Sequence, residues 1–266
     1  MFRSCAKSMI TLFSEPWLLF ILLVLLLSGA AVVGYRFAVA TRINDIGHLH
    51  EQITGLRDGL FILEGLLIGF TIAMVLPRFE HREDLVVEEA SAIRTTMLRA
   101  DVLPEPQRSK TLELLREYVA VRKDFASVGL TTPAALARNT DRTTALQDEL
   151  WQQAAAVTRQ NQSALVSAYI GSLNEMIHVS EQRLAYLERR VPTEVWIIII
   201  MVGAFQSFVA GYNLKQKFWL SLVITPVVVA LVVTVIVDLD SPRTGFIRIE
   251  QNSMERLSNS IAGGQP

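Results

Sequence analysis

Residues 60–78 read LFILEGLLIGFTIAMVLPR, and this stretch decides the fold. Glu64 is its one charged residue before Arg78, so the run is apolar almost throughout. An α-helix needs about 20 apolar residues to cross the hydrocarbon core of a bilayer. The stretch therefore predicts a membrane-spanning helix over residues 60–76, called span two below.

Three more apolar runs of this kind lie along the chain, at residues 17–40, 195–212 and 218–237. Tryptophan and tyrosine stand near their ends, where amphipathic rings favour the level of the lipid headgroups. The first run is longer than the ~7–15 apolar residues of a signal peptide. An uncleaved span is therefore favoured, although Ala38-Val39-Ala40 resembles a cleavage site. The sequence predicts an all-α fold with a four-helix transmembrane bundle.

The composition fits a membrane protein in which apolar and charged blocks alternate. Of the 266 residues, 51% are hydrophobic and 19% are charged, and the formal net charge is −1. This balance offers no basic surface, so no nucleic-acid partner is predicted. Cys5 is the single cysteine, which excludes a multi-cysteine metal site. The sequence contains no phosphate-binding loop, nucleophile elbow or His-Glu-x-x-His motif, and we predict no enzyme, no cofactor and no metal site.

Four spans place both termini and the segment 77–193 on one side of the membrane. Basic residues close to the membrane are more numerous on that side than on the other, and the positive-inside rule makes the richer side the cytoplasmic one. Those on the richer side are Arg3, Lys7, Arg78, Arg82, Arg183, Arg189, Arg190, Arg243 and Arg248. We therefore expect a multi-pass protein in the lipid of a bacterial cytoplasmic (inner) membrane, with both termini and residues 77–193 in the cytoplasm.

The segment 77–193 is predicted to be a long helical extension of spans two and three. Apolar residues recur at helical spacing from Arg78 to Leu103, where two prolines follow. Further helices are predicted over 107–128, more weakly over 143–159, and from Ser163 to Arg190, where Pro192 ends the last one. Thr132-Pro133 resembles an N-cap followed by proline at the first helical position. We expect the first helix to continue straight out of span two, the last to lead straight into span three, and spans and extension to form one continuous unit. Glu88, Glu89 and Glu175 are interpreted as partners of arginines in this segment.

Span two carries two distinct rows of residues. Gly65, Gly69 and Ala73 lie four residues apart, and such a row of small residues allows another helix to approach closely. A second row recurs at alternating steps of four and three. Its members are Glu64, Ile68, Thr71, Val75 and Arg78.

The second row predicts the lining of a pore. Ionisable groups inside a span usually face a water-filled cavity or a partner. A ring of Glu64 carboxylates would attract cations at the pore mouth, with Ile68 and Val75 as constrictions. The alternative is that Glu64 reaches the membrane interface or hydrogen-bonds a neighbouring helix. Gln206 and Ser207 in the third span are interpreted as packing residues.

Asp238 and Asp240 follow the last span and form a possible cation or gating site. Calcium takes about 6–8 oxygen ligands, more than these two carboxylates supply. The alternative is a hydrogen-bonding role at the end of the helix, in a pair with Arg243 or with an arginine of the extension.

Several motifs resemble the bestrophin-like domain family of membrane proteins. They are Glu64-Gly65-Leu66-Leu67-Ile68-Gly69-Phe70-Thr71, Arg78-Phe79-Glu80, Leu85-Val86-Val87-Glu88-Glu89-Ala90, Arg99-Ala100-Asp101-Val102-Leu103-Pro104, Leu114-Leu115-Arg116-Glu117-Tyr118-Val119, Ser172-Leu173-Asn174-Glu175-Met176-Ile177 and the run from Val237 to Arg248. The resemblance covers residues 60–256 and leaves the first span, within residues 1–59, outside the domain. Residues 257–266 are expected to form a flexible C-terminal tail.

The family is distantly similar to bestrophins, which are pentameric four-span channels with cytoplasmic helical domains. The resemblance implies a homo-oligomer, a pentamer by analogy, with span two lining a pore for inorganic ions. It also relates Asp238 and Asp240 to the acidic cluster that binds calcium in animal bestrophins. This sequence has no longer acidic run there and no aromatic-rich pore neck, so calcium gating and anion selectivity do not carry over.

Two functions follow from these patterns. The first is a homo-oligomeric ion channel with span two on the axis. The second is a non-conducting membrane scaffold or sensor whose cytoplasmic helical extension recruits a protein partner.

Overall fold

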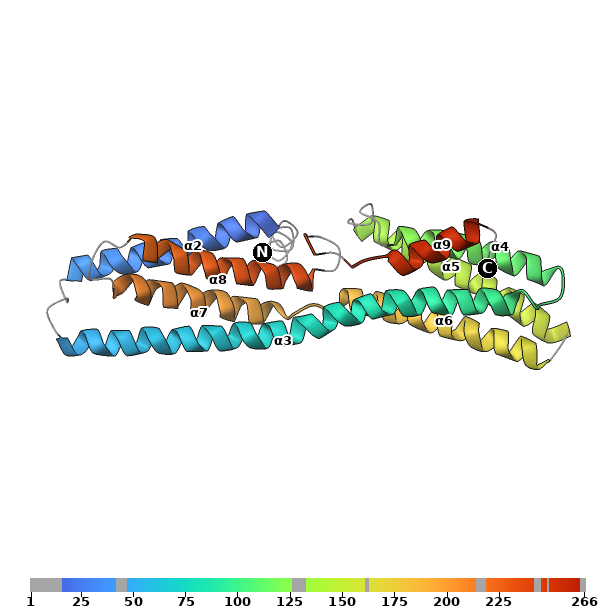
Figure 1. The fold of residues 1–266 in the computed structure, drawn as a ribbon, viewed down its shortest axis with the longest axis horizontal. Helices are drawn as coiled ribbons and strands as arrows, with labels where there is room; N and C mark the ends of the chain where they lie inside the picture. The colour runs from blue at the N-terminus through green and yellow to red at the C-terminus, as the bar shows by residue number, and fades with distance from the viewer. Residues whose placement is uncertain are drawn as a thin grey trace. The chain divides into compact units, whose positions relative to one another are not determined.

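The computed structural model describes residues 16–41, 47–125, 133–160, 163–213, 219–241, 245–247 and 249–263. All regular structure in these residues is helical, which confirms the predicted all-α class (Figure 1). The helices are α2 (Pro16–Thr41), α3 (Gly47–Ala100), α4 (Gln107–Asp124), α5 (Pro133–Gln160), α6 (Ala164–Glu188), α7 (Thr193–Tyr212), α8 (Trp219–Asp240) and α9 (Asn252–Ala262).

The chain divides into two compact units. The span unit comprises Met1–Phe79 and Arg190–Ile247, and the helical unit comprises Glu80–Arg189 and Arg248–Pro266. The expectation of one continuous unit is therefore replaced by two, each with its own apolar core. The C-terminal segment belongs to the helical unit, so this unit is built from two separate parts of the sequence.

The span unit holds the predicted bundle. Four helices of the described chain are long and apolar enough to cross a membrane, which confirms the four predicted spans. Helices α2, α7 and α8 pack against one another, and α3 contacts α7 through a hydrogen bond from Asn213 to Thr54. The core between the helices is apolar, and includes Leu19, Leu23, Val75, Trp196, Ile199, Ala230, Val233 and Ile236.

Helix α3 is longer at both ends than span two alone. It begins at Gly47, thirteen residues before the predicted start of span two at residue 60, and passes through Pro77 to Ala100. The prediction that the first helix of the extension continues out of span two is therefore confirmed. Helix α6 ends at Glu188, close to the predicted end at Arg190, and α7 begins at Thr193 after a short break. Arg189 is extended, and Pro192 has no N–H to donate into a continuous helix.

Helices α2 and α7 approach each other through glycine. A Cβ atom added at Gly34 would overlap the carbonyl oxygen of Phe208, and one added at Gly211 would overlap that of Ala31. Each glycine therefore lies directly against the backbone of the opposite helix. Small residues play this part in membrane bundles, where dispersion between closely packed helices replaces the hydrophobic effect.

The helical unit surrounds a second core. Helix α4 packs against α5 and α9, and α5 packs against α6, while Thr96 of α3 donates a hydrogen bond to the carbonyl oxygen of Ser172 in α6. The core residues include Ile93, Leu115, Tyr118, Leu146, Leu150, Tyr169, Leu173 and Met176. Helix α5 starts at Pro133, the first helical position that the Thr132-Pro133 pair predicts, and it runs through the weaker helix predicted over 143–159.

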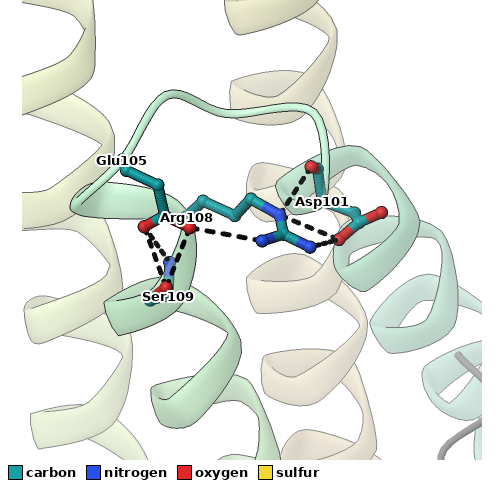
Figure 2. A network of polar contacts seen from close by, with 4 residues as sticks. All are labelled: Asp101, Glu105, Arg108 and Ser109. Carbon is teal, nitrogen blue, oxygen red and sulfur yellow. Dashed lines mark hydrogen bonds and ion pairs between the residues drawn. The ribbon is translucent and has the colours of Figure 1, made fainter.

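The corner between α3 and α4 is fixed by polar contacts (Figure 2). Arg108 donates to the backbone and side-chain oxygens of Asp101, at the end of α3. The Glu105 carboxylate accepts from the N–H and the hydroxyl of Ser109, and so provides an acceptor for the first turn of α4. Pro104 and Pro106 lie between the two helices, as the sequence predicts.

The predicted flexible tail is helical over most of its length. Helix α9 runs to Ala262, and Leu257, the first residue of the expected tail, is buried in the core of the helical unit beside Met254. Its apolar residues at i, i+3 and i+7, namely Met254, Leu257 and Ile261, form one face of the helix. The last residues, 264–266, lie outside the described part of the chain.

The contact between α2 and α7 gives a direct test. Gly34→Ala should destabilise the protein by about 1–3 kcal/mol, because the added methyl group meets a helix backbone that has to shift. Thermal unfolding of the detergent-solubilised protein measures the loss. Gly29→Ala in the same helix is the matched control, since its Cβ would meet nothing within 4 Å. Equal stability of the two variants would contradict the close contact.

Candidate functional site

Span two, residues 60–76 of α3, is buried on one side only. Glu64, Thr71 and Val75 are 2%, 1% and 1% exposed, while Ile68 is half-buried against the same core. Arg78, at the inner end of the row, is half-buried as well. The side that carries the predicted pore-lining row therefore packs against the chain's own helices.

The opposite side of span two is bare. Gly65, Gly69 and Ala73 are exposed, and a Cβ at either glycine would meet nothing within 4 Å. Among the described residues, no helix packs against this row of small residues. Ile62, at 75%, is the most exposed large apolar residue of the described chain.

The row that the sequence predicts to line a pore is therefore the covered one in a single subunit, and the row of small residues is the exposed one. Side chains that line an axis between subunits are exposed in a single subunit, whereas Glu64, Thr71 and Val75 are covered. The physical reason is that Thr71 satisfies its hydroxyl on the carbonyl oxygen of Leu67 in its own helix, which lets it pack among apolar groups.

The Glu64 carboxyl group lies against α7. A Cβ added at Gly203 would come within 2.6 Å of its Oε1 atom, so the absence of a side chain at Gly203 leaves room for the carboxyl group. Neither carboxyl oxygen has a hydrogen-bond partner in the described chain. Gln206, one turn further along α7, is 0% exposed, and neither polar atom of its amide has a partner.

Asp238 and Asp240 are occupied by backbone N–H groups. Asp238 accepts hydrogen bonds from the N–H groups of Phe246 and Ile247, at 3.1 and 2.9 Å. Asp240 accepts from the N–H of Val191 at 3.1 Å. Gly245 has a φ of 129° and lies directly against the Asp238 carboxylate, so glycine alone suits this turn.

These bonds give the two aspartates the hydrogen-bonding role that the sequence left open. Asp238 fixes the turn after α8. Asp240 links the end of α8 to Val191, which lies in the short segment between α6 and α7. No group of three or more potential metal-ligating side chains occurs in the described residues. Arg243, the partner considered for the aspartates, lies outside the described part of the chain.

A buried charge cluster joins three helices of the helical unit. The Glu89 carboxylate of α3 accepts from Arg122 of α4 and from Arg183 of α6, and all three side chains are buried. Arg183 also donates to Gln251, the residue that precedes α9, at 2.8 Å. The Arg122 guanidinium lies 4.3 Å from the ring centre of Phe125. The prediction that Glu89 pairs with arginines is confirmed.

The cluster keeps Glu89 ionised. Burial alone would raise the pKa of its carboxyl group, but the guanidinium groups of Arg122 and Arg183 outweigh burial and hold the pKa below its ordinary value. Because the pKa is lowered, the ionised carboxyl group stabilises the fold fully when the pH is above the ordinary pKa of a carboxyl group. The stabilisation is lost as the pH falls through the lowered pKa.

Glu89→Gln should lower the free energy of unfolding by about 3–5 kcal/mol, because it leaves two buried guanidinium groups without their carboxylate. Glu117→Gln is the matched control. Glu117 pairs with Arg142 on the surface, where such a pair contributes about 0–1 kcal/mol. Chemical unfolding of both variants at neutral pH measures the difference, and equal losses would contradict a structural role for the cluster.

Together the four spans and the helical unit define a multi-pass, all-α membrane protein. The chain belongs to the bestrophin-like domain family, whose model matches residues 19–254. The match includes most of the first span, so the expectation that this span falls outside the domain is corrected. The family is membrane-embedded, and the family and fold are known for ion channels.

Solved structures share the fold. The chain is similar to the crystal structure of a bacterial bestrophin homologue from Klebsiella pneumoniae, with a TM-score of 0.68 and 16% identity over 93% of this chain and 98% of that one. A tyrosine-to-alanine variant of that homologue gives a TM-score of 0.66 and 14% identity over 92% and 99%. A comparison with curated protein sequences gives no match.

Proposed function

We propose that the chain is one subunit of a homo-oligomeric ion channel in which α3 lines the axis. The observation that carries this proposal is the bare side of span two. Only 17% of the most apolar window of α3 is buried within the chain, against 44% in α8. A row of small residues on that side favours contact between helices of different copies over contact with lipid alone.

The proposed lining lies opposite Glu64 on the helix. At 100° per residue, Ile62, Leu66, Gly69 and Ala73 occupy that side, and all four are exposed. Ile62 and Leu66 are the large residues among them and would form apolar rings, which gate channels by excluding water. Asp58, seven residues before Gly65 and eleven before Gly69, is exposed on the same side and would supply a carboxylate ring at the outer mouth.

The remaining features of the proposal follow the charge pattern and the family. Both termini and the helical unit lie in the cytoplasm, the surrounding lipid is that of a bacterial inner membrane, and the subunit number is five. Inorganic ions are the permeating species.

A second candidate function rests on a groove in the helical unit. The groove has a volume of about 570 Å³ and lies between α3 and α6, with the carboxylates of Glu88 and Glu175 on its walls. A non-conducting scaffold or sensor would use such a surface to bind a soluble protein. Silent bilayers together with stoichiometric capture of one soluble partner would favour this function over the channel.

Conductance tests the proposed lining. Leu66→Ala should raise the single-channel conductance of the purified protein in planar bilayers, because it removes an apolar ring from the proposed axis. Leu63→Ala is the control, since Leu63 is exposed but lies roughly 80° away from the lining side. Equal conductance of the two variants, or silence of the wild-type protein, would contradict the proposal.

Ion preference distinguishes Asp58 from Glu64, two acidic residues that α3 carries on different sides. Asp58→Asn should reduce the permeability ratio of potassium to chloride, because it removes a carboxylate ring from the outer mouth. Glu64→Gln should leave the ratio unchanged, because Glu64 packs inside the subunit. Reversal potentials in a salt gradient measure both. A large effect of Glu64→Gln with none of Asp58→Asn would return Glu64 to the pore.

A further inference from the structure

The proposed pore lining does not explain why the carboxyl group of Glu64 is buried inside the subunit. Its carboxyl group is buried within the membrane part of a single subunit, and neither oxygen has a hydrogen-bond partner in the described chain. An ionised group in that position is costly unless it meets an opposite charge or water. Such an acidic residue is therefore expected to bind a species that removes its charge.

No charged side chain faces Glu64 from the helices packed around it. In the described residues, Arg36 is the one charged residue of α2, nine positions after Leu27, which lies beside Gly203. The one charged residue of α7 is Glu194, nine positions before Gly203. Asp238 and Asp240 stand at the far end of α8. In α3 itself, Arg57 is bound to Asp58, and Arg78 is fourteen residues away.

The surroundings are nevertheless polar and shaped for a carboxyl group. Gly203 leaves the space that Oε1 occupies, since a Cβ there would come within 2.6 Å. Gln206 is completely buried one turn further on, with both polar atoms of its amide unpartnered. On α2, Ser28 follows Leu27 in sequence, and its hydroxyl is also buried without a partner. Three helices thus bring unsatisfied polar groups to this level of the bundle.

We propose that Glu64, at its contact with Gly203 of α7, is a proton-binding site inside each subunit. A proton neutralises a carboxylate without any further ligand. A metal cation requires several oxygen ligands, and one carboxylate with single amide and hydroxyl oxygens falls short of such a shell. The site lies on the covered side of α3 and is therefore separate from the surface proposed to line the axis.

Binding of the proton couples pH to the contact between α3 and α7. With the proton bound, a neutral carboxyl group fits against Gly203 in an apolar setting. When the proton leaves at alkaline pH, an unpaired carboxylate remains between the two helices, and water or a cation has to enter or the helices have to separate. The site therefore makes the packing of α3 dependent on protonation at one residue.

Infrared spectroscopy of the full protein in lipid bilayers tests the proposal. At neutral pH, the difference between wild type and Glu64→Gln should contain the carbonyl stretch of a protonated carboxyl group. The band should disappear reversibly as the pH is raised. Addition of sodium chloride at constant pH should leave it in place.

Two variants control the assignment. Asp58→Asn should leave the band unchanged, because Asp58 is exposed and paired with Arg57. Gly203→Ala should shift the band, because the added carbon displaces the carboxyl group. Absence of the band from the wild-type protein at neutral pH, or its loss on addition of sodium at constant pH, would overturn the proposal. If Glu64→Gln does not fold, the shift of the wild-type band in Gly203→Ala assigns the band to Glu64, and none of these measurements depends on whether the protein conducts.

Discussion

The uneven burial of α3 is the constraint on which the rest of the structure depends. A single apolar span has two options in a bilayer: to pack against protein or to face lipid. Span two packs one side, around Glu64, Thr71 and Val75, against its own chain and leaves the side of Ile62 and Gly69 bare. The covered side holds the buried carboxyl group, and the bare side is the surface available to other subunits. Both proposals follow from this division.

Different interactions stabilise the interior of each unit. In the span unit, Gly34 and Gly211 bring the backbones of α2 and α7 together, as expected where lipid removes the hydrophobic effect between helices. In the helical unit, apolar burial and the Glu89 cluster replace close backbone contact. Because Arg183 binds both Glu89 and Gln251, the cluster also ties the chain that enters α9 to the core.

Much of the fold could be predicted from the sequence, because spans and helix ends depend on local composition. The four apolar runs, the continuation of α3 and the stop at Pro104 were all predictable on that basis. The side of span two that packs inside the subunit could not be predicted. Periodicity distinguishes two sides of a helix but does not show which of them contacts the other helices of the same chain. Span three carries the same kind of small row at Gly203, Ser207 and Gly211, which could have revealed the actual contacts. The packing of α9 against the helical unit could not be predicted. A short amphipathic segment resembles a flexible tail when the surface that buries its apolar side is not known.

In the proposed channel, the bare side of α3 faces a common axis. A cryo-EM structure of the oligomer in lipid nanodiscs tests this arrangement most directly. We expect a closed ring in which Ile62 and Leu66 lie nearest the axis, with Glu64 enclosed within each subunit against Gly203. An oligomer with Glu64 and Thr71 on the axis, or one in which the bare side of α3 faces lipid, would contradict it.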